Sequence, residues 1–360
     1  MEKLKRTPLY NRHREFGAKL VPFAGFEMPL QYKGILHEAK AVRSSCGIFD
    51  VSHMGEIEIS GKDALSFVSY ITLNNPAKLK EYQAQYSGMC YPTGGMVDDI
   101  VVYNFPDKFL IVVNAANIEK DYEWMVKNKK GDVKIENKSD YWALIAVQGP
   151  DAIKIFEKIF DGEIPPKRFR FRQGKINGID VFLSRTGYTG EDGFEVFVTS
   201  ENAVKIWDWI FEAGKEFGIE PAGLGARDIL RLEAGYCLYG NDIDENTTPL
   251  EAGLSWIVKF DKDNFIGKDA LLKQKEEGLK RKLTGFIVED KIIPRKGYDI
   301  YKGDEKAGVV TSGGFSPHLN CPIGMGYISL PFEEGEEIKI DCRGKKVKAR
   351  IKPGGFVRKV

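Results

Sequence analysis

The sequence has no excess of charge of either sign and no long apolar run. Its 53 Lys and Arg residues nearly balance its 52 Asp and Glu residues, so no net field attracts the whole chain to nucleic acid or to an anionic membrane. No stretch approaches the roughly 18–20 apolar residues that a membrane-spanning helix requires. These absences predict no nucleic-acid partner and no membrane partner, and a charged partner must be recognised by a local patch.

Cysteine is also scarce. The five cysteines are scattered along the 360 residues, odd in number and without C-x-x-C spacing, a pattern that favours neither a disulfide framework nor a zinc site. The opening segment MEKLKRTPLYNRHREFG is basic and lacks the apolar core of a signal peptide. We therefore expect a cytoplasmic protein without a bound metal.

The common nucleotide-binding and catalytic motifs are missing as well. The chain contains no GxxxxGK[ST], no HExxH and no GxSxG. The segment GLGARD (223–228) has two glycines at the dinucleotide-binding spacing, but it lacks the third glycine and follows Pro221 rather than a strand. The sequence therefore argues against an enzyme that depends on ATP or NAD.

What is present is a mixture of helical and strand patterns without a steady βαβ rhythm, which predicts an α+β fold. Residues 118–127 have the spacing of an amphipathic helix, and Asn177-Gly178 is typical of a type I′ hairpin turn. Near residue 275 a charged stretch gives way to short strands punctuated by glycine, typical of a small β-barrel or sandwich. We expect two regions, residues 1–275 and residues 276–360.

Two adjacent carboxylates occur in the segment YPTGGMVDDIVVY, where Asp98 and Asp99 precede the apolar residues Ile100 to Tyr103. We expect them at the beginning of a buried strand, and neighbouring side chains of a strand face opposite ways. A carboxylate that faces inward is costly unless something binds it, which makes the pair a candidate ligand contact. An acidic turn that caps the strand explains the pattern equally well.

A second candidate site is the glycine-rich segment RTGYTGEDGFEVFV. Glu195 lies near the start of an apolar strand and, with a period of two, shares a face with Phe197. One carboxylate can accept two parallel N–H donors, an arrangement that suits the edge of an aminopyrimidine ring. The alternative is a glutamate that faces solvent in a hairpin.

Other polar residues carry less information. Arg227, at the start of a predicted helix, has the planar fork that clamps a carboxylate, but it can equally pair with a protein carboxylate. His53 titrates in the range of a general base, yet no Ser or Cys partner is legible nearby. Glu56 and Glu58 alternate with Ile57 and Ile59, which predicts a strand with one buried face.

Longer segments of the sequence resemble the T-proteins of the glycine cleavage system. The resemblance runs essentially end to end, in order and at the spacing of that family. The segments that carry it are RTPLYNRHREFGAKLVPFAGFEMPLQY, RSSCGIFDVSHMGEIEISG, GGMVDDIVVYN, LIVVNAANIEKDYEW, LIAVQGP, SRTGYTGEDGFEV, PAGLGARDILRLEAGYCLYGNDIDENTTPLEAGLSW and RKGYDIY with GVVTSGGFSPHLN.

This resemblance implies a fold and a reaction. T-proteins form a cloverleaf of three subdomains, of which the first two are intertwined in sequence and the last is a jelly-roll-like β-barrel domain, with folate in the central hole. The implied activity is that of a tetrahydrofolate-dependent aminomethyltransferase. It moves the one-carbon unit from the lipoyl arm of H-protein to tetrahydrofolate and releases ammonia, 5,10-methylenetetrahydrofolate and dihydrolipoyl H-protein.

The resemblance also implies roles for individual residues. Asp99 matches the catalytic carboxylate, and Glu195 matches the acceptor for the pterin edge. A basic residue near the C-terminus contacts the folate tail in that family, and either Arg358 or Lys359 fits. The remaining matched positions line the folate pocket: Met54, Tyr86, Asn114, Tyr188 and Arg227.

Relatives with the same fold remain as alternatives. A folate-dependent demethylase also needs a folate pocket with an acidic residue, and a non-catalytic folate-binding relative needs the pocket alone. The related dehydrogenases carry an additional flavin domain, for which 360 residues without a GxGxxG motif leave no room. The iron–sulfur assembly relative has a cysteine motif where this chain has TGYTGEDG.

Overall fold

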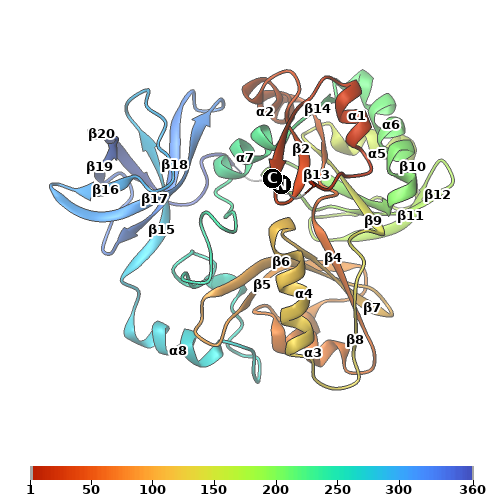
Figure 1. Cartoon of the computed structure of the whole chain (residues 1–360), viewed down its shortest axis with the longest axis horizontal. Coiled ribbons are helices and arrows are strands. Elements are labelled where there is room, and N and C mark those ends of the chain that lie inside the picture. Colours follow the sequence, from red (N-terminus) through yellow and green to blue (C-terminus); the bar gives the residue numbers. More distant parts are fainter. Residues whose placement is uncertain (1–2, 359–360) are drawn as a thin grey trace.

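The computed structural model describes residues 3–358, which form three lobes around a central helix, α7 (Leu224–Glu233) (Figure 1). Two lobes are each built on one open sheet, and the third is a closed barrel. The mixture of helices and sheets confirms the predicted α+β class. Within residues 3–358 no helix is long and apolar enough to cross a membrane.

The first lobe contains a seven-stranded sheet in the order β10-β11-β12-β13-β9-β3-β14. Helices α5 (Ala152–Ile159) and α6 (Ala203–Gly214) cover one face, because their apolar sides pack with that face into a single buried cluster. The strands are β3 (Gly47–Asp50), β9 (Trp142–Gln148), β10 (Phe160–Asp161), β11 (Phe171–Ile176), β12 (Ile179–Ser184), β13 (Gly193–Thr199) and β14 (Glu220–Pro221). The hairpin β1 (Lys19–Phe23)–β2 (Phe26–Gln31) and helices α1 (Tyr10–Glu15) and α2 (Ile35–Ser44) complete this lobe.

The second lobe contains a five-stranded sheet in the order β5-β6-β7-β4-β8. Helices α3 (Ala64–Ile71) and α4 (Ile118–Lys127) cover its outer face through a second buried cluster. The strands are β4 (Gly55–Ser60), β5 (Gln83–Cys90), β6 (Met96–Asn104), β7 (Lys108–Val113) and β8 (Lys134–Asn137).

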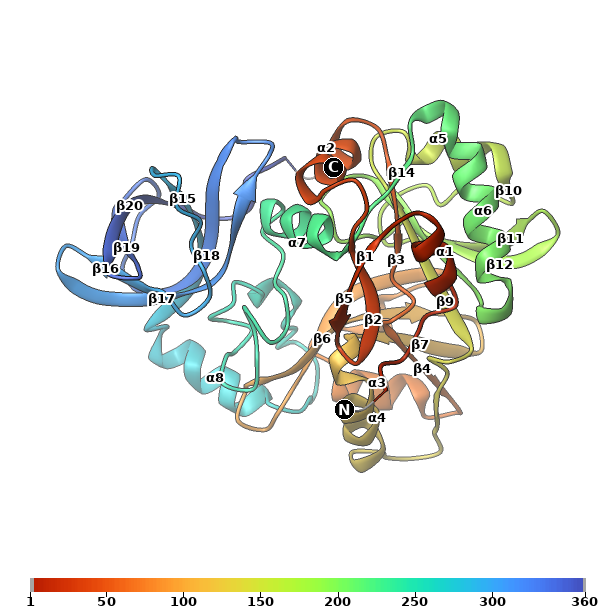
Figure 2. The same cartoon turned by 45° about the horizontal axis from the view of Figure 1, so that its top comes forward.

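The chain passes from the first lobe to the second and back. Strand β3 pairs with β9 in the first lobe, whereas β4, which follows β3 directly, pairs with β7 and β8 in the second (Figure 2). The chain returns to the first lobe at β9. The two lobes are therefore intertwined in sequence, as the resemblance implied.

The inner faces of the two sheets enclose an apolar layer. Val101 and Tyr103 of β6 meet Phe197 of β13 in this layer. Because side chains alternate along a strand, Asp99 shares the face of Tyr103, and Glu195 shares the face of Phe197. Both carboxylates therefore face the space between the two sheets, at the edge of the apolar layer.

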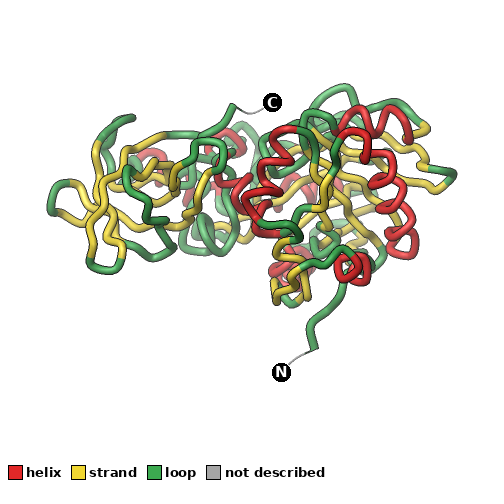
Figure 3. The backbone as a smooth tube through the Cα atoms, turned by 90° about the horizontal axis from the view of Figure 1, so that it is seen from above, coloured by secondary structure: helices red, strands yellow, loops and turns green. Residues whose placement is uncertain are grey.

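The third lobe is a closed barrel of six strands in the order β15-β18-β17-β16-β19-β20. Of the two predicted forms, barrel and sandwich, the structure has the barrel, which lies at one end of the molecule (Figure 3). The predicted boundary at residue 275 falls within α8 (Lys268–Glu277) and stays a prediction. The strands are β15 (Arg281–Val288), β16 (Asp299–Lys302), β17 (Glu305–Ser316), β18 (Cys321–Ser329), β19 (Glu337–Cys342) and β20 (Lys345–Lys352).

Buried ion pairs on α7 connect the barrel to the first lobe. The Arg231 guanidinium lies 2.6 Å from the Asp242 carboxylate and donates to Ser312 of β17 at 2.8 Å. Glu233 accepts from Ser316 of β17 on one oxygen and from Arg43 of α2 on the other. A buried pair whose remaining polar atoms are satisfied fixes orientation, so α7 holds the barrel in a fixed position against the first lobe.

The local predictions can be compared with these elements. The predicted helix at 118–127 coincides with α4, and Asn177 and Gly178 have the positive φ angles of 45° and 82° that a type I′ turn needs. The expected position of Asp98 and Asp99 at the start of a strand is wrong. Strand β6 begins at Met96, because Asp98 pairs with Met89 and Asp99 with Gly88 of β5.

Candidate active site

Asp99 is held by two neighbouring side chains between the sheets. The Tyr86 hydroxyl of β5 donates to one carboxylate oxygen at 3.0 Å, and Asn114 Nδ2 donates to the other at 2.9 Å. These donors fix the plane of the carboxylate. The structure therefore brings three of the predicted site residues, Tyr86, Asp99 and Asn114, into direct contact.

Asp98 lies behind Asp99 and is fully buried. It accepts from the Asn114 backbone N–H at 3.0 Å, from Asn114 Nδ2 at 2.8 Å and from Asn117 Nδ2 at 2.8 Å. Asn114 Nδ2 thus donates to both aspartates. Asp98 has the partners of a structural anion, whereas Asp99 is half-buried and faces the space between the sheets.

The surroundings of Asp99 disfavour its charge. Burial raises the pKa of Asp99 to about 7, and the nearby Asp98 charge contributes in the same direction. The hydrogen bonds from Tyr86 and Asn114 oppose this pKa shift. A carboxyl that titrates near neutrality is typical of a catalytic acid or base.

Glu195 lies on β13 in the opposite sheet. The Thr186 hydroxyl donates to one of its carboxylate oxygens, and Thr186 in turn contacts the Tyr103 hydroxyl at 3.2 Å. Burial raises the pKa of Glu195, while Thr186 and the Arg227 charge lower it. The face shared with Phe197 confirms the periodicity on which this candidate rested.

Glu56 on β4 was not selected from the sequence. It is 1% exposed, and neither carboxyl oxygen accepts a hydrogen bond from any residue between 3 and 358. Burial and the Glu195 charge raise the pKa of Glu56 well above its usual value, which favours the protonated, neutral form of the group. The alternation of Glu56 with Ile57 predicted that one face of β4 is buried. The other face, on which Glu56 lies, is covered by the sheet of the first lobe.

We expect Glu56→Gln to be more stable than the wild type at neutral pH. Because the folded pKa of Glu56 exceeds its unfolded pKa, its stabilising effect is full below about pH 4.5 and is lost as pH rises. As the pH rises, the unfolding free energy of Glu56→Gln should therefore increase relative to that of the wild type, by at most about 1.4 kcal/mol per pH unit. Urea unfolding at pH 5, 6 and 7 measures it, and parallel curves would show that Glu56 is ionised in the folded protein.

Tyr188 and Arg227 form a second group on the barrel side of the site. The Arg227 guanidinium lies 4.6 Å from the centroid of the Tyr188 ring, and the Tyr188 hydroxyl donates to the Cys237 carbonyl. Burial raises the pKa of Tyr188, and among the nearby charges Arg231 lowers it while Asp99 raises it. Tyr188 is therefore an electrostatic neighbour of Asp99.

Trp256 is a further residue that sequence reasoning missed. Its indole stacks on the Tyr86 ring, with ring centroids 5.8 Å apart and an angle of 24° between the planes. The side chain is 55% exposed, although the Tyr86 ring on which it stacks is half-buried, and tryptophan is on average a highly buried residue. The sequence carried no signal for this contact, because Trp256 and Tyr86 meet only in the folded chain.

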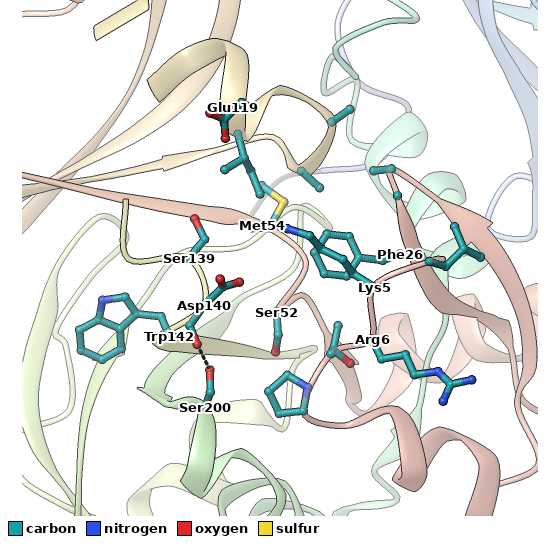
Figure 4. Close-up of a pocket in the computed structure, with 18 of the residues that line it drawn as sticks. Lys5, Arg6, Phe26, Ser52, Met54, Glu119, Ser139, Asp140, Trp142 and Ser200 are labelled. Carbon is teal, nitrogen blue, oxygen red and sulfur yellow. Dashed lines mark hydrogen bonds between the residues drawn. The ribbon is translucent and has the colours of Figure 1, made fainter. Parts of the chain in front are cut away.

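Met54 lies apart from these contacts, on the wall of a cleft of about 960 Å³. Figure 4 shows its side chain pointing toward Lys5 and Phe26, with Glu119 of α4 beyond it. Of the two candidates for the folate tail, Arg358 is exposed, and Lys359 lies outside the described residues.

His53 does not have the properties of a base. It is 1% exposed and meets the edges of the Phe23 and Phe26 rings. Burial, followed by the Arg227 charge, lowers the pKa of His53 to about 3. The histidine is therefore neutral at physiological pH and serves the packing of the first lobe.

Comparisons with known proteins identify the family of the chain. Residues 9–262 match the GCVT N-terminal domain, and residues 281–357 match the glycine cleavage T-protein C-terminal barrel domain. The chain belongs to the glycine cleavage T-protein family. It is 51% identical to an aminomethyltransferase of Halothermothrix orenii, over 97% of this chain and 98% of that protein. It is 50% identical to an aminomethyltransferase of a Thermoanaerobacter species, over 100% of this chain and 99% of that protein.

A solved structure supports the same assignment. The crystal structure of the glycine cleavage system aminomethyltransferase T from Bartonella henselae matches with a TM-score of 0.92 and 34% identity, over 99% of each chain. The predicted T-protein fold, with its α+β lobes and C-terminal barrel, is confirmed. The predicted enzyme class, an aminomethyltransferase of the glycine cleavage system, is confirmed as well.

Proposed function

We propose that the chain transfers the one-carbon unit from the aminomethylated lipoyl arm of H-protein to tetrahydrofolate, with Asp99 as the catalytic carboxylate. The observation that carries this proposal is the position of Asp99 in the space between the sheets. Tyr86 and Asn114 orient it there, and its pKa of about 7 lies near the working pH. Tetrahydrofolate, when bound, supplies the nitrogen that accepts the one-carbon unit.

The role that we assign to Asp99 is electrostatic. The carbon that is transferred becomes positively charged as ammonia leaves, and a fixed anion stabilises that charge most strongly where water is excluded. The donors on Asp99 are already in place, so no reorientation accompanies the reaction. Asp99 in its ionised form also accepts a hydrogen bond from an N–H of the nucleophile and orients it.

The chemistry of the surrounding side chains fits a reduced pterin. Within residues 3–358 only the Thr186 hydroxyl donates to Glu195, which leaves the second oxygen to accept from the paired N–H groups of a pterin edge. Tyr188 with Arg227, and Tyr86 with Trp256, offer aromatic faces beside it. We assign the pterin edge to Glu195 and the wall of the pocket to Asn114 and these rings. Met54 is assigned to the wall on the resemblance alone, because none of these other residues lines the cleft at Met54.

The lipoylated H-protein is the partner that this reaction requires. The five cysteines, none of which is in a disulfide, are typical of a reducing compartment and support a cytoplasmic location. For the folate tail, both Arg358 and Lys359 remain candidates.

The experiment that tests the proposal is ammonia release from aminomethyl-loaded H-protein, with and without tetrahydrofolate. We expect release that depends strongly on folate. A protein that binds folate but shows no stimulation would contradict the proposal. Turnover of a small methylated amine without H-protein would then point to a demethylase, and no turnover of either substrate to a non-catalytic folate-binding protein.

In the same assay the activity should decline at low pH, and we call this decline the acid limb of the pH profile. If ionised Asp99 is the working form, kcat/KM for aminomethyl-loaded H-protein should fall about tenfold per pH unit below a midpoint near pH 7, because kcat/KM reports the groups of the free enzyme and the pKa of Asp99 is about 7. The kcat/KM of the wild type between pH 5.5 and 8.5 measures the limb. A profile that is flat down to pH 5.5 would contradict ionised Asp99 as the working group.

A further inference from the structure

A third carboxyl lies behind the two aspartates. Asp121 on α4 is fully buried, and neither of its oxygens accepts a hydrogen bond from a donor within residues 3–358. The nearest cation is Lys120, whose Nζ is 3.5 Å from Asp121 Oδ1. That ammonium is turned elsewhere, since it donates to the Val97 carbonyl and to the Tyr239 hydroxyl at 3.2 Å. Asp121 therefore has one ion-pair partner, which two other acceptors share, and no hydrogen-bond donor. This is little compensation for a buried anion.

The start of α4 packs against β6 at Asp98, because Asn117 Nδ2 donates to Asp98 at 2.8 Å and Lys120, next to Asp121, donates to the Val97 carbonyl. This packing brings the Asp121 carboxyl near that of Asp98, and the Asp98 charge acts on it. Two neighbouring carboxylates in a buried place do not both ionise, so the pair holds one proton. Asp98 has three N–H donors, from Asn114 and Asn117, and Asp121 has none. The negative charge is therefore most stable on Asp98 and the proton on Asp121.

The titratable groups around Asp121 agree with this assignment. Burial raises the pKa of Asp121 to about 10, Asp98 raises it as well, and Lys120 only partly opposes both. The other titratable groups that face Asp121 are Tyr91, at the end of the β5–β6 hairpin, and Tyr239, in the loop after α7; Glu245 in that loop also acts on both tyrosines. Both tyrosines are neutral at pH 7, and Glu245 carries no positive charge, so nothing on these elements favours an ionised Asp121.

We propose that Asp98 and Asp121 form a carboxylate–carboxylic acid pair with a single negative charge on Asp98, and that this charge positions Asn114 against Asp99. The same charge lies beside Asp99 and disfavours its ionisation. This inference rests on the role proposed for Asp99. Asp98 acts only through its neighbours, because Asn114 Nδ2 donates to Asp98 at 2.8 Å and to Asp99 at 2.9 Å. Asp98 is thus a positioning residue, and Asp121 holds the proton that leaves the pair with one charge.

The pair can be tested with two isosteric variants in the ammonia-release assay. Asp98→Asn removes the charge next to Asp99, so its acid limb should move to lower pH by about one unit. Asp121→Asn replaces a neutral donor by a neutral donor, so its acid limb should stay at the wild-type position. If the acid limb moves in Asp121→Asn, or if it stays at the wild-type position in Asp98→Asn, the negative charge is not on Asp98 and the proposal is overturned. A purely structural effect lowers the plateau without moving the limb.

A second measurement does not depend on activity or on the folding of Asp98→Asn. The wild type should lose stability relative to Asp121→Asn as pH rises from about 4 toward 10, because the folded protein keeps a proton that the unfolded chain releases. Urea unfolding of both proteins at pH 5, 7 and 9 measures this loss, and parallel curves would overturn the protonated Asp121. Failure of the proposed function is recognised separately, because the wild type would then show no folate-stimulated ammonia release, whereas the urea unfolding curves do not depend on activity.

Discussion

Asp99→Asn is expected to lower folate-stimulated ammonia release by about 10²–10³-fold. The variant keeps the size of the side chain but removes the negative charge that faces the space between the sheets. It also places an N–H₂ group where Tyr86 and Asn114 now donate, so one of these donors loses its acceptor. The fold should persist, because the core of the second lobe does not depend on this side chain.

The measurement is single-turnover ammonia release at saturating tetrahydrofolate, together with a folate titration. Asp107→Asn is the matched control, because Asp107 is exposed in the turn between β6 and β7, and the same change of charge there should leave the rate at the wild-type value. Folate affinity of Asp99→Asn should stay within about threefold, which corresponds to less than about 0.7 kcal/mol. A rate within about threefold of the wild type would remove Asp99 from the chemistry.

The sequence predicted those parts of the fold that depend on local patterns. Helix α4 coincides with the predicted range because the apolar spacing that predicts it is a local property of the sequence. The turn at Asn177-Gly178 was legible because few residues other than Asn and Gly tolerate the two positive φ angles. The start of β6 could not be predicted from the local sequence, because it is set by pairing with β5, the other strand of the hairpin.

The candidate site was predictable to a similar extent. The face of Glu195 followed from a period of two, and the strand confirms it. Glu56, Asp121 and Trp256 were missed for one physical reason. Each acquires its environment from an element distant in the chain: the opposite sheet, strand β6 and strand β5. The catalytic role of Asp99 and the folate contacts stay predictions.

Glu195→Ala is expected to weaken the binding of tetrahydrofolate rather than to slow the chemistry. A carboxylate that accepts charge-assisted hydrogen bonds contributes about 1.5–3 kcal/mol, so the dissociation constant should rise by about 10- to 150-fold. Turnover at saturating folate should fall much less, because Asp99 and its donors are untouched. This split between affinity and rate distinguishes Glu195 from Asp99.

Glu195→Gln separates the charge of this residue from its shape. A glutamine keeps one acceptor for the Thr186 hydroxyl, but it presents a donor or a neutral oxygen to the pterin edge, so its affinity should fall between the wild type and Glu195→Ala. Glu201→Ala, at an exposed position just after β13, is the control and should bind folate normally. Equal affinities for all four proteins would exclude Glu195 from the pocket. The pterin would then have to be recognised elsewhere, and Glu56, whose two oxygens lack donors among the described residues, would be the next carboxyl to replace.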